Sequence, residues 1–110
     1  MRKTICLLIL VSVSMFISSN AFAHKVSLFA YVEGGKIFTE SFFPDGRAVE
    51  GGKVTVYDSQ DQLLLEGKTD SQGYFNFPVP KIDDLTIVLD ATMGHKADFK
   101  LKKEEVGAGK

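Results

Sequence analysis

The two histidines of the chain stand where they could bind a metal ion. His24 follows Ala21-Phe22-Ala23, and cleavage after this tripeptide would make His24 the first residue, with a free α-amine beside its imidazole. These two nitrogens can close a chelate ring on one ion. Both lose a proton near neutral pH, because model amines titrate at about 7.7–8.0 and imidazole at about 6.5. Nitrogen ligands of this kind suit borderline ions such as Ni²⁺, Co²⁺ and Cu²⁺.

His95 stands at the start of the last predicted strand, over residues 96–101, and shares parity with the apolar Phe99. His24 in the same way shares parity with Val26. Because side chains alternate between the two faces of a strand, both histidines are expected to point toward the core. If the first and last strands run parallel as neighbours, the two rings converge at one end of the domain. The result would be a site of three nitrogens, one amine and two imidazoles.

The remaining ligands of such a site stay open. Asp90, Asp98 and Glu40 are candidate oxygen ligands, and the strand register cannot be read well enough to choose among them. Met93 is a candidate soft ligand if the ion is copper, although a methionine here also fits a core or loop position. The alternative for the histidines themselves is that they are partly exposed, hydrogen-bonded side chains without a metal.

No enzyme is predicted. The single cysteine, Cys6, precedes the cleavage site, and the chain has no G-x-S-x-G turn, phosphate-binding glycine loop or H-E-x-x-H helix. Asp83 and Asp84 are a paired-carboxylate candidate, but adjacent side chains point apart on an extended segment. We therefore expect them to be solvated and expect no catalytic residues.

Residues 1–23 have the order of a cleavable signal peptide: two basic residues, an apolar stretch over residues 5–16, and an A-x-A cleavage site. The alternative is an uncleaved membrane anchor, which needs roughly 18 unbroken apolar residues. The apolar stretch is shorter than this and is interrupted by Ser12 and Ser14. We therefore expect export to the periplasm or the exterior of the cell envelope, with no membrane anchor after cleavage.

Cleavage would leave 87 of the 110 residues, enough for one domain. Loss of Arg2 and Lys3 takes the 13 basic residues to 11 against 14 acidic ones, a net charge of −3 with neutral histidines. This mildly acidic balance argues against nucleic acid as a partner, since nucleic-acid sites need clustered basic residues. The exported chain would also lack cysteine, so packing alone must stabilise it.

Short segments in which apolar and polar residues alternate recur between polar turns, and no segment has sustained helical periodicity. The pattern predicts an all-β fold: a single immunoglobulin-like or transthyretin-like antiparallel β-sandwich of about seven strands after a helical signal peptide. The sandwich is expected over residues 24–102. A flexible tail is expected over residues 103–110, which end in Gly-Ala-Gly-Lys.

Several aromatic residues have the parity opposite to the apolar core, so one sheet could expose them. An exposed aromatic patch would suggest a protein partner, whereas a loop covering the sheet would give it only a packing role. The residues concerned are Phe29, Tyr31, Phe38, Phe42 and Tyr74.

The middle of the chain resembles carboxypeptidase-regulatory-like and transthyretin-like modules. The resemblance lies in Val54-Thr55-Val56-Tyr57-Asp58 and in the stretch 65–75, which contains Thr69-Asp70-Ser71-Gln72-Gly73-Tyr74-Phe75. Many secreted β-modules share this pattern. It implies the fold and says little about function.

The ends of the domain are more informative. Residues 24–26, 29–34, 39–43 and 89–97 together look like the small periplasmic accessory proteins of bacterial cobalt and nickel uptake transporters of the energy-coupling-factor type. The resemblance implies a protein that binds nickel or cobalt outside the membrane or assists the membrane-embedded transporter subunits. Within it, His24 and His95 occupy the matching metal-site positions. The alternative is a structural or interaction β-sandwich of the cell envelope that binds no metal.

Overall fold

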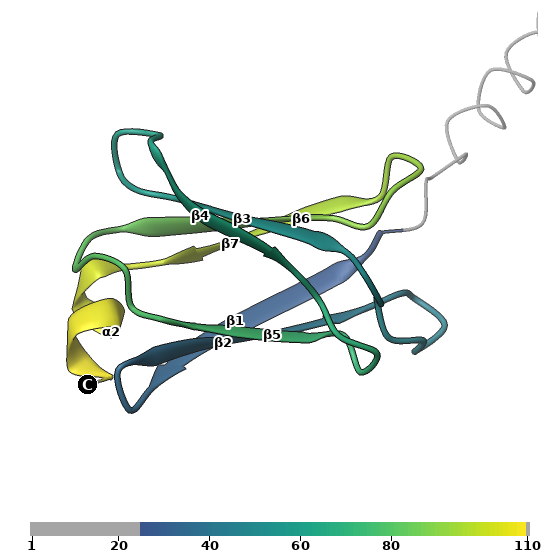
Figure 1. The fold of residues 1–110 in the computed structure, drawn as a ribbon, viewed down its shortest axis with the longest axis horizontal. Coiled ribbons are helices and arrows are strands. Elements are labelled where there is room, and N and C mark those ends of the chain that lie inside the picture. Colours follow the sequence, from purple (N-terminus) through teal and green to yellow (C-terminus); the bar gives the residue numbers. More distant parts are fainter. Residues whose placement is uncertain (1–24, 110) are drawn as a thin grey trace, which may run out of the picture.

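The computed structural model describes residues 25–109, so the expected signal peptide and His24 lie outside the described residues. The described chain forms seven antiparallel strands and one short helix (Figure 1). The elements are β1 (Ser27–Glu33), β2 (Lys36–Phe42), β3 (Lys53–Tyr57), β4 (Leu63–Lys68), β5 (Tyr74–Pro78), β6 (Leu85–Asp90), β7 (Lys96–Leu101) and α2 (Lys103–Ala108).

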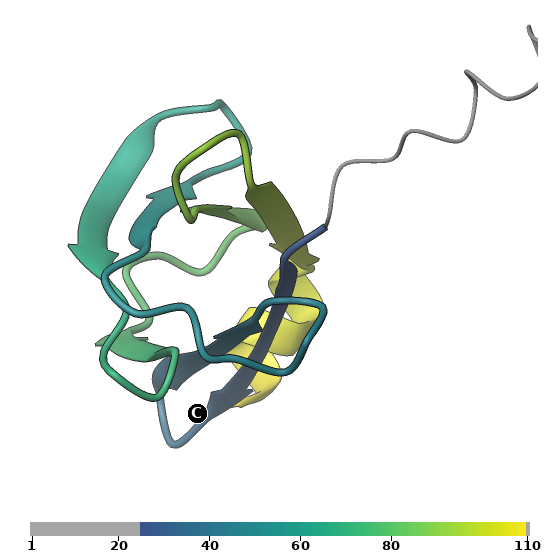
Figure 2. The same ribbon diagram turned by 90° about the vertical axis from the view of Figure 1, so that its right-hand side faces the viewer.

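The strands form two sheets packed face to face, a three-stranded sheet in the order β1-β2-β5 and a four-stranded sheet in the order β4-β3-β6-β7 (Figures 1 and 2). Alternate residues of each strand face the space between the sheets, which is the core. Its fully buried side chains include Ile37 from the first sheet and Val54, Val56, Ile87 and Leu89 from the second. The predicted all-β sandwich of about seven strands is therefore confirmed.

The facing edges of the two sheets bring β1 and β7 together. The Phe29 ring of β1 meets the Phe99 ring of β7 edge to face, with 5.5 Å between ring centroids. Both strands run from the end that holds the β6–β7 hairpin toward the end that holds α2 (Figure 1). The first and last strands thus run side by side in parallel, the condition for the two histidines to converge, but they belong to different sheets and contact each other through side chains.

A flexible tail is expected over residues 103–110, but the described part of it, residues 103–109, forms the helix α2 and its C-cap Gly109. Its Val106 is fully buried and belongs to the core, and the Lys103 N–H donates to Asp84 Oδ1 at 2.8 Å. The Gly109 carbonyl accepts the Gly35 N–H at 2.9 Å, which ties the end of the helix to the β1–β2 turn. One apolar side chain in a polar segment gives no helical period, so this ordering depends on tertiary contacts that the sequence pattern does not reveal.

Replacing Val106 with alanine should lower the free energy of unfolding by about 1–3 kcal/mol, because the change removes buried methyl groups and leaves a cavity. Chemical denaturation measures the change. Glu104→Ala on the exposed side of α2 is the matched control and should change stability by no more than about 0.5 kcal/mol. Equal stability of both variants would mean that α2 does not dock in solution.

Asp58 closes the β3–β4 turn from a buried position. Its Oδ1 accepts the backbone N–H groups of Gln60 and Gln62, both at 2.9 Å, and its Oδ2 accepts Lys81 Nζ at 3.0 Å. The Gln62 N–H, followed by the Lys81 side chain, holds the pKa of Asp58 below its ordinary value. The hydrogen bond between Lys81 and Asp58 in turn raises the pKa of Lys81.

The lowered pKa of Asp58 predicts a loss of stability in acid. The charged carboxylate stabilises the fold above the pKa of the unfolded chain, about 3.9, and this contribution disappears as the pH falls through the lower pKa of the folded state. Asp58→Asn should therefore be less stable than the parent at pH 7 and should lose less stability between pH 5 and pH 2. Urea unfolding across this range, with the exposed Asp98→Asn as control, measures the difference. An acid loss in Asp58→Asn as large as in the parent would contradict it.

Candidate functional site

The β6–β7 hairpin fixes the backbone of His95. The His95 carbonyl accepts the Ala91 N–H at 2.8 Å, and the His95 N–H donates to the Thr92 carbonyl at 3.0 Å. The Thr92 N–H donates to Asp90 Oδ1 at 3.0 Å, which closes the turn from the β6 side. The histidine thus enters β7 from a tightly hydrogen-bonded turn.

This turn is strained. Thr92, Met93 and Gly94 all have positive φ, at 71°, 53° and 81°. A β-branched residue such as threonine rarely adopts this region, and such residues cost on the order of 1–3 kcal/mol each. Strained backbone of this kind tends to occur at functional sites, which draws attention to the hairpin.

The side chain of His95 lies on the inner side of its strand, as its parity predicted. Ala97 and Phe99 on the same side are partly buried and Leu101 is fully buried, while the alternate residues of β7 are exposed. His95 itself is partly buried and meets the Phe43 ring edge to face, with centroids 6.0 Å apart. Of the two predicted metal ligands, the structure therefore describes one, and that one points inward.

The described chain begins beside this hairpin (Figure 1). Phe29 and Phe99 are in contact, β1 and β7 run in the same direction, and extended strands rise by the same 3.3 Å or so per residue. Lys25 lies four residues before Phe29, and His95 lies four residues before Phe99. Lys25 and His95 are therefore expected at about the same height along the two strands. His24, which lies outside the described residues, is bonded directly to Lys25.

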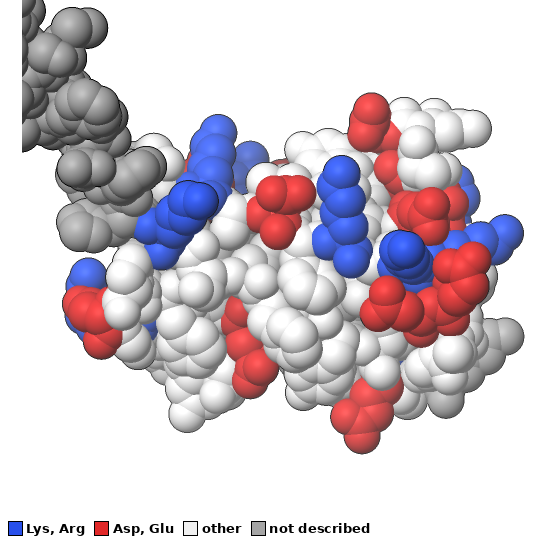
Figure 3. Space-filling view, turned by 180° about the vertical axis from the view of Figure 1, so that it is seen from behind, with Lys and Arg blue, Asp and Glu red and all other residues white. Residues whose placement is uncertain are grey.

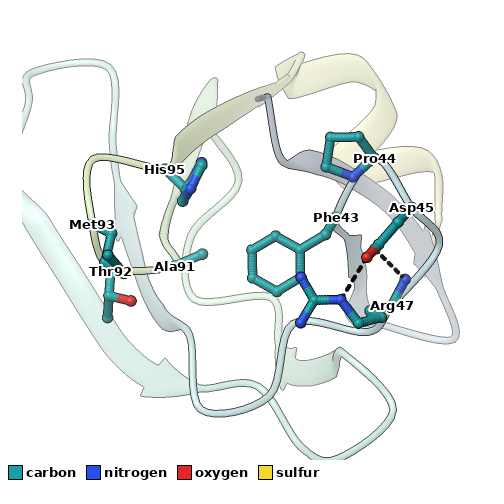
Figure 4. A pocket seen from close by; sticks show the side chains of 8 residues that line it. All are labelled: Phe43, Pro44, Asp45, Arg47, Ala91, Thr92, Met93 and His95. Atoms are coloured by element: carbon teal, nitrogen blue, oxygen red, sulfur yellow. Dashed lines mark hydrogen bonds and ion pairs between the residues drawn. The ribbon is translucent and has the colours of Figure 1, made fainter. Parts of the chain in front are cut away.

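A pocket of about 650 Å³ opens in front of His95. Figure 4 shows it between the β6–β7 hairpin and the loop that follows β2, with the Phe43 ring at its centre. The loop contributes Phe43, Pro44, Asp45 and Arg47, and the hairpin contributes Ala91, Thr92, Met93 and His95. Met93 is 92% exposed, so its thioether is accessible from solution.

The loop after β2 carries an ion pair into this pocket. Arg47 Nε donates to Asp45 Oδ2 at 2.6 Å, and the Arg47 N–H donates to Asp45 Oδ1 at 3.0 Å. The backbone N–H, followed by the Arg47 side chain, holds the pKa of Asp45 below its ordinary value. The Arg47 guanidinium lies 4.9 Å from the centre of the Phe43 ring, which also packs at a steep angle against the His95 ring. A cation, an aromatic ring and an imidazole therefore form a continuous row.

The sequence does not reveal this part of the pocket, because residues 44–47 carry only the local pattern of a turn. The turn chemistry is real: the Gly46 N–H donates to the Phe43 carbonyl and the Phe43 N–H to the Arg47 carbonyl. The contact with His95 joins positions more than 40 residues apart. The local signal that could have been used is the acidic and basic pair at Asp45 and Arg47, flanking a glycine beside an aromatic residue.

The three candidate oxygen ligands do not share the side of His95. Glu40, Asp90 and Asp98 fall on the outward positions of β2, β6 and β7, whose inward neighbours form the core. Asp90 lies 4.0 Å from Lys96 Nζ on that outer face. Within residues 25–109, no group of three or more His, Cys, Asp or Glu side chains is placed to hold a metal ion. A metal at His95 would therefore need ligands from outside the described chain or from the pocket loop.

The outer face of the three-stranded sheet exposes aromatic side chains, as the parity predicted. Phe29 is 52% exposed, Tyr74 40% and Tyr31 38%, and the Tyr31 ring stacks on the Phe38 ring at 5.4 Å. The stacking covers one face of each ring. Three members of the expected aromatic set are thus exposed, whereas the other two, Phe38 and Phe42, are half-buried.

The surface charges are mixed. Figure 3 shows basic and acidic side chains interspersed over one side of the described domain, without an extended area of one sign. On the side that the figure shows, the described domain thus presents no extended basic surface of the kind that binds nucleic acid. Over the described residues, no helix has the length and apolar character needed to cross a membrane.

Comparisons with known proteins give one distant relative. The chain is 30% identical over 81 residues to an uncharacterized protein of Haemophilus influenzae, an alignment that covers 71% of this chain and 50% of that protein. The chain thus spans about half the length of the relative that it matches. No protein-family model and no solved structure matches the chain.

Proposed function

We propose that the chain is an exported accessory protein that binds a divalent transition metal, nickel or cobalt, and supports its uptake by a membrane transporter. The ligands are the α-amine and imidazole of His24, after cleavage before that residue, and the imidazole of His95. The metal is cargo rather than a resident cofactor. The observation that carries the proposal is the inward-facing His95 in a pocket at the end where β1 begins.

The geometry supports this assignment in two ways. The contact between Phe29 and Phe99 sets β1 and β7 side by side in parallel, and in the sequence His24 immediately precedes Lys25, the residue expected to be level with His95. The strained turn then holds the backbone of His95 without help from a metal. Because the backbone of this metal-binding residue is already fixed, less conformational entropy is lost when a metal binds.

Affinity alone does not identify the ion that is carried. Nitrogen sites generally bind divalent metals in the order Co²⁺, Ni²⁺, Cu²⁺, so copper should bind most tightly in a test tube. The partner transporter and metal supply would select nickel or cobalt in the cell. Met93, exposed at the rim of the pocket, is a possible additional ligand for a softer ion.

Calorimetric titration with Ni²⁺, Co²⁺ and Cu²⁺ tests the proposal in two forms of the protein. One form begins at His24, and the other is acetylated on the α-amine of His24, which converts this amine into an amide without adding a new one. We expect the processed form to bind at least about tenfold more tightly than the acetylated form. Equal affinity would remove the amine from the site, and mass spectrometry of the exported protein would check that cleavage falls before His24.

A second candidate function is supported by the aromatic outer face of the three-stranded sheet. Phe29, Tyr31 and Tyr74 are all more than one-third exposed, and large exposed apolar surfaces often mark protein contacts. On this view the domain is an interaction module of the cell envelope without a metal. Absence of metal binding by both forms in the titration would favour this candidate.

A further inference from the structure

The pocket in front of His95 is much larger than a bare metal ion requires. Its volume of about 650 Å³ falls within the range of small-molecule sites, roughly 300–1,000 Å³. Phe43, Pro44 and Ala91 provide apolar walls, while Arg47 and His95 provide polar groups that reach the same space. An apolar pocket with a few convergent polar groups is typical of a site for an organic ligand.

The guanidinium of Arg47 indicates the chemical class of that ligand. The ion pair with Asp45 uses the Nε–H of the guanidinium and leaves the four N–H groups on its two terminal nitrogens outside that pair. These groups form a planar fork that matches a carboxylate. The Asp45 side chain fixes one edge of the guanidinium, and the Phe43 ring lies against its face. The arginine is therefore held in place before a ligand arrives.

We infer that the pocket takes the metal as a complex with a small organic carboxylate chelator rather than as a bare ion. This inference rests on the proposed function. The protein supplies nitrogen ligands to the metal, the chelator fills the remaining coordination positions, and a carboxylate of the chelator binds Arg47. The carbon skeleton of the chelator packs against Phe43, Pro44 and Ala91.

Arg47 also favours the complex over the free ion by charge. A guanidinium beside a bare divalent cation is repulsive, whereas a metal bound to a carboxylate chelator carries less positive charge and presents an acceptor to the arginine. Asp45 offsets part of the charge of Arg47, but both side chains are largely exposed, Arg47 at 72% and Asp45 at 56%. Water screens such an exposed pair, so the guanidinium keeps most of its charge toward a ligand.

Equilibrium dialysis with a labelled chelator tests the inference in the form that begins at His24. The probes are Ni²⁺ alone, Ni²⁺ with citrate, Ni²⁺ with L-histidine, and each chelator without metal. We expect one of the two chelators to be retained with the protein only when Ni²⁺ is present. Retention of citrate would identify a hydroxycarboxylate complex, and retention of histidine would identify an amino-acid complex.

Two variants separate the role of Arg47 from a general effect of charge. Arg47→Gln should weaken binding of the nickel–chelator complex about tenfold more than it weakens binding of Ni²⁺ alone, because it removes a charge-assisted carboxylate contact. Lys100→Gln removes one positive charge from an exposed position of β7 and should change both affinities equally. Thermal melting of both variants confirms that they fold.

The outcomes distinguish the inference from the proposed function. If Ni²⁺ binds and neither chelator is retained, the metal enters as a bare ion and the inference fails while the proposed function stands. If Arg47→Gln weakens the binding of Ni²⁺ alone and of the nickel–chelator complex equally, Arg47 does not bind a carboxylate of the chelator. If no nickel binds with or without a chelator, both the inference and the proposed function fail.

Discussion

Replacing His95 with alanine should weaken Ni²⁺ binding by the processed chain about 100-fold or more. The variant removes one of the three proposed nitrogen ligands, and even residues that only orient metal ligands commonly contribute 10–100-fold to affinity. His95 lies on the inner side of β7 in the pocket, so the effect should be specific to this side of the strand. Calorimetric titration of the form that begins at His24 measures the loss.

Asp98→Ala is the matched control for this experiment. Asp98 lies three residues further along the same strand on its exposed side, and its loss should leave Ni²⁺ affinity within about twofold of the parent value. Unchanged affinity in His95→Ala would remove this residue from the site. A comparable loss in Asp98→Ala would place the metal on the outer face of β7, contrary to the proposal.

Gly73→Ala should lower the free energy of unfolding by about 3 kcal/mol or more. Gly73 has φ of +78° in the β4–β5 turn, and its carbonyl accepts hydrogen bonds at 2.9 Å from both the backbone N–H and the hydroxyl of Ser41. A methyl group there would collide with the Ser41 carbonyl. The turn would have to move away, and the loss of two buried hydrogen bonds adds to the cost of a positive φ in alanine.

The effect of the collision can be separated from that of the backbone conformation. Gly46 has a similar φ of +89°, but a methyl group there would meet open space. Gly46→Ala should therefore cost only the conformational part, about 1–2 kcal/mol. Denaturant unfolding of the two variants measures the difference, and equal losses would show that the approach to Ser41 is not rigid.

The elements that the sequence predicts well are those with a local period. Alternation along residues 26–32 and 96–101 correctly predicts which side chains of β1 and β7 face the core, and this is why the inward position of His95 could be expected. The exposure of Phe29 and Tyr31 follows from the same period. A strand carries this information in every second residue, so it survives without knowledge of its partners.

The parts that could not be predicted depend on contacts between distant segments. The docking of α2 depends on Val106 and on the acceptance of the Lys103 N–H by Asp84, which lies 19 residues away. The wall formed by Phe43 and Arg47 reaches His95 only because the loop after β2 and the β6–β7 hairpin meet at one end of the sandwich. The choice among the candidate oxygen ligands Glu40, Asp90 and Asp98 depended on strand register, and the structure places all three on outward positions of their strands.

The hydrogen bond from Gly35 to Gly109 has a practical consequence for anyone handling this protein. It holds the last described turn against the β1–β2 connection, at the end of the sandwich away from His95 (Figure 1). A resin, a sensor surface or a fluorescent label attached beyond residue 109 would leave the His95 pocket facing solution. A tag placed ahead of His24 would convert the amine on which the proposed chelate depends into an amide, and assays of the tagged protein would then underestimate its affinity for metal.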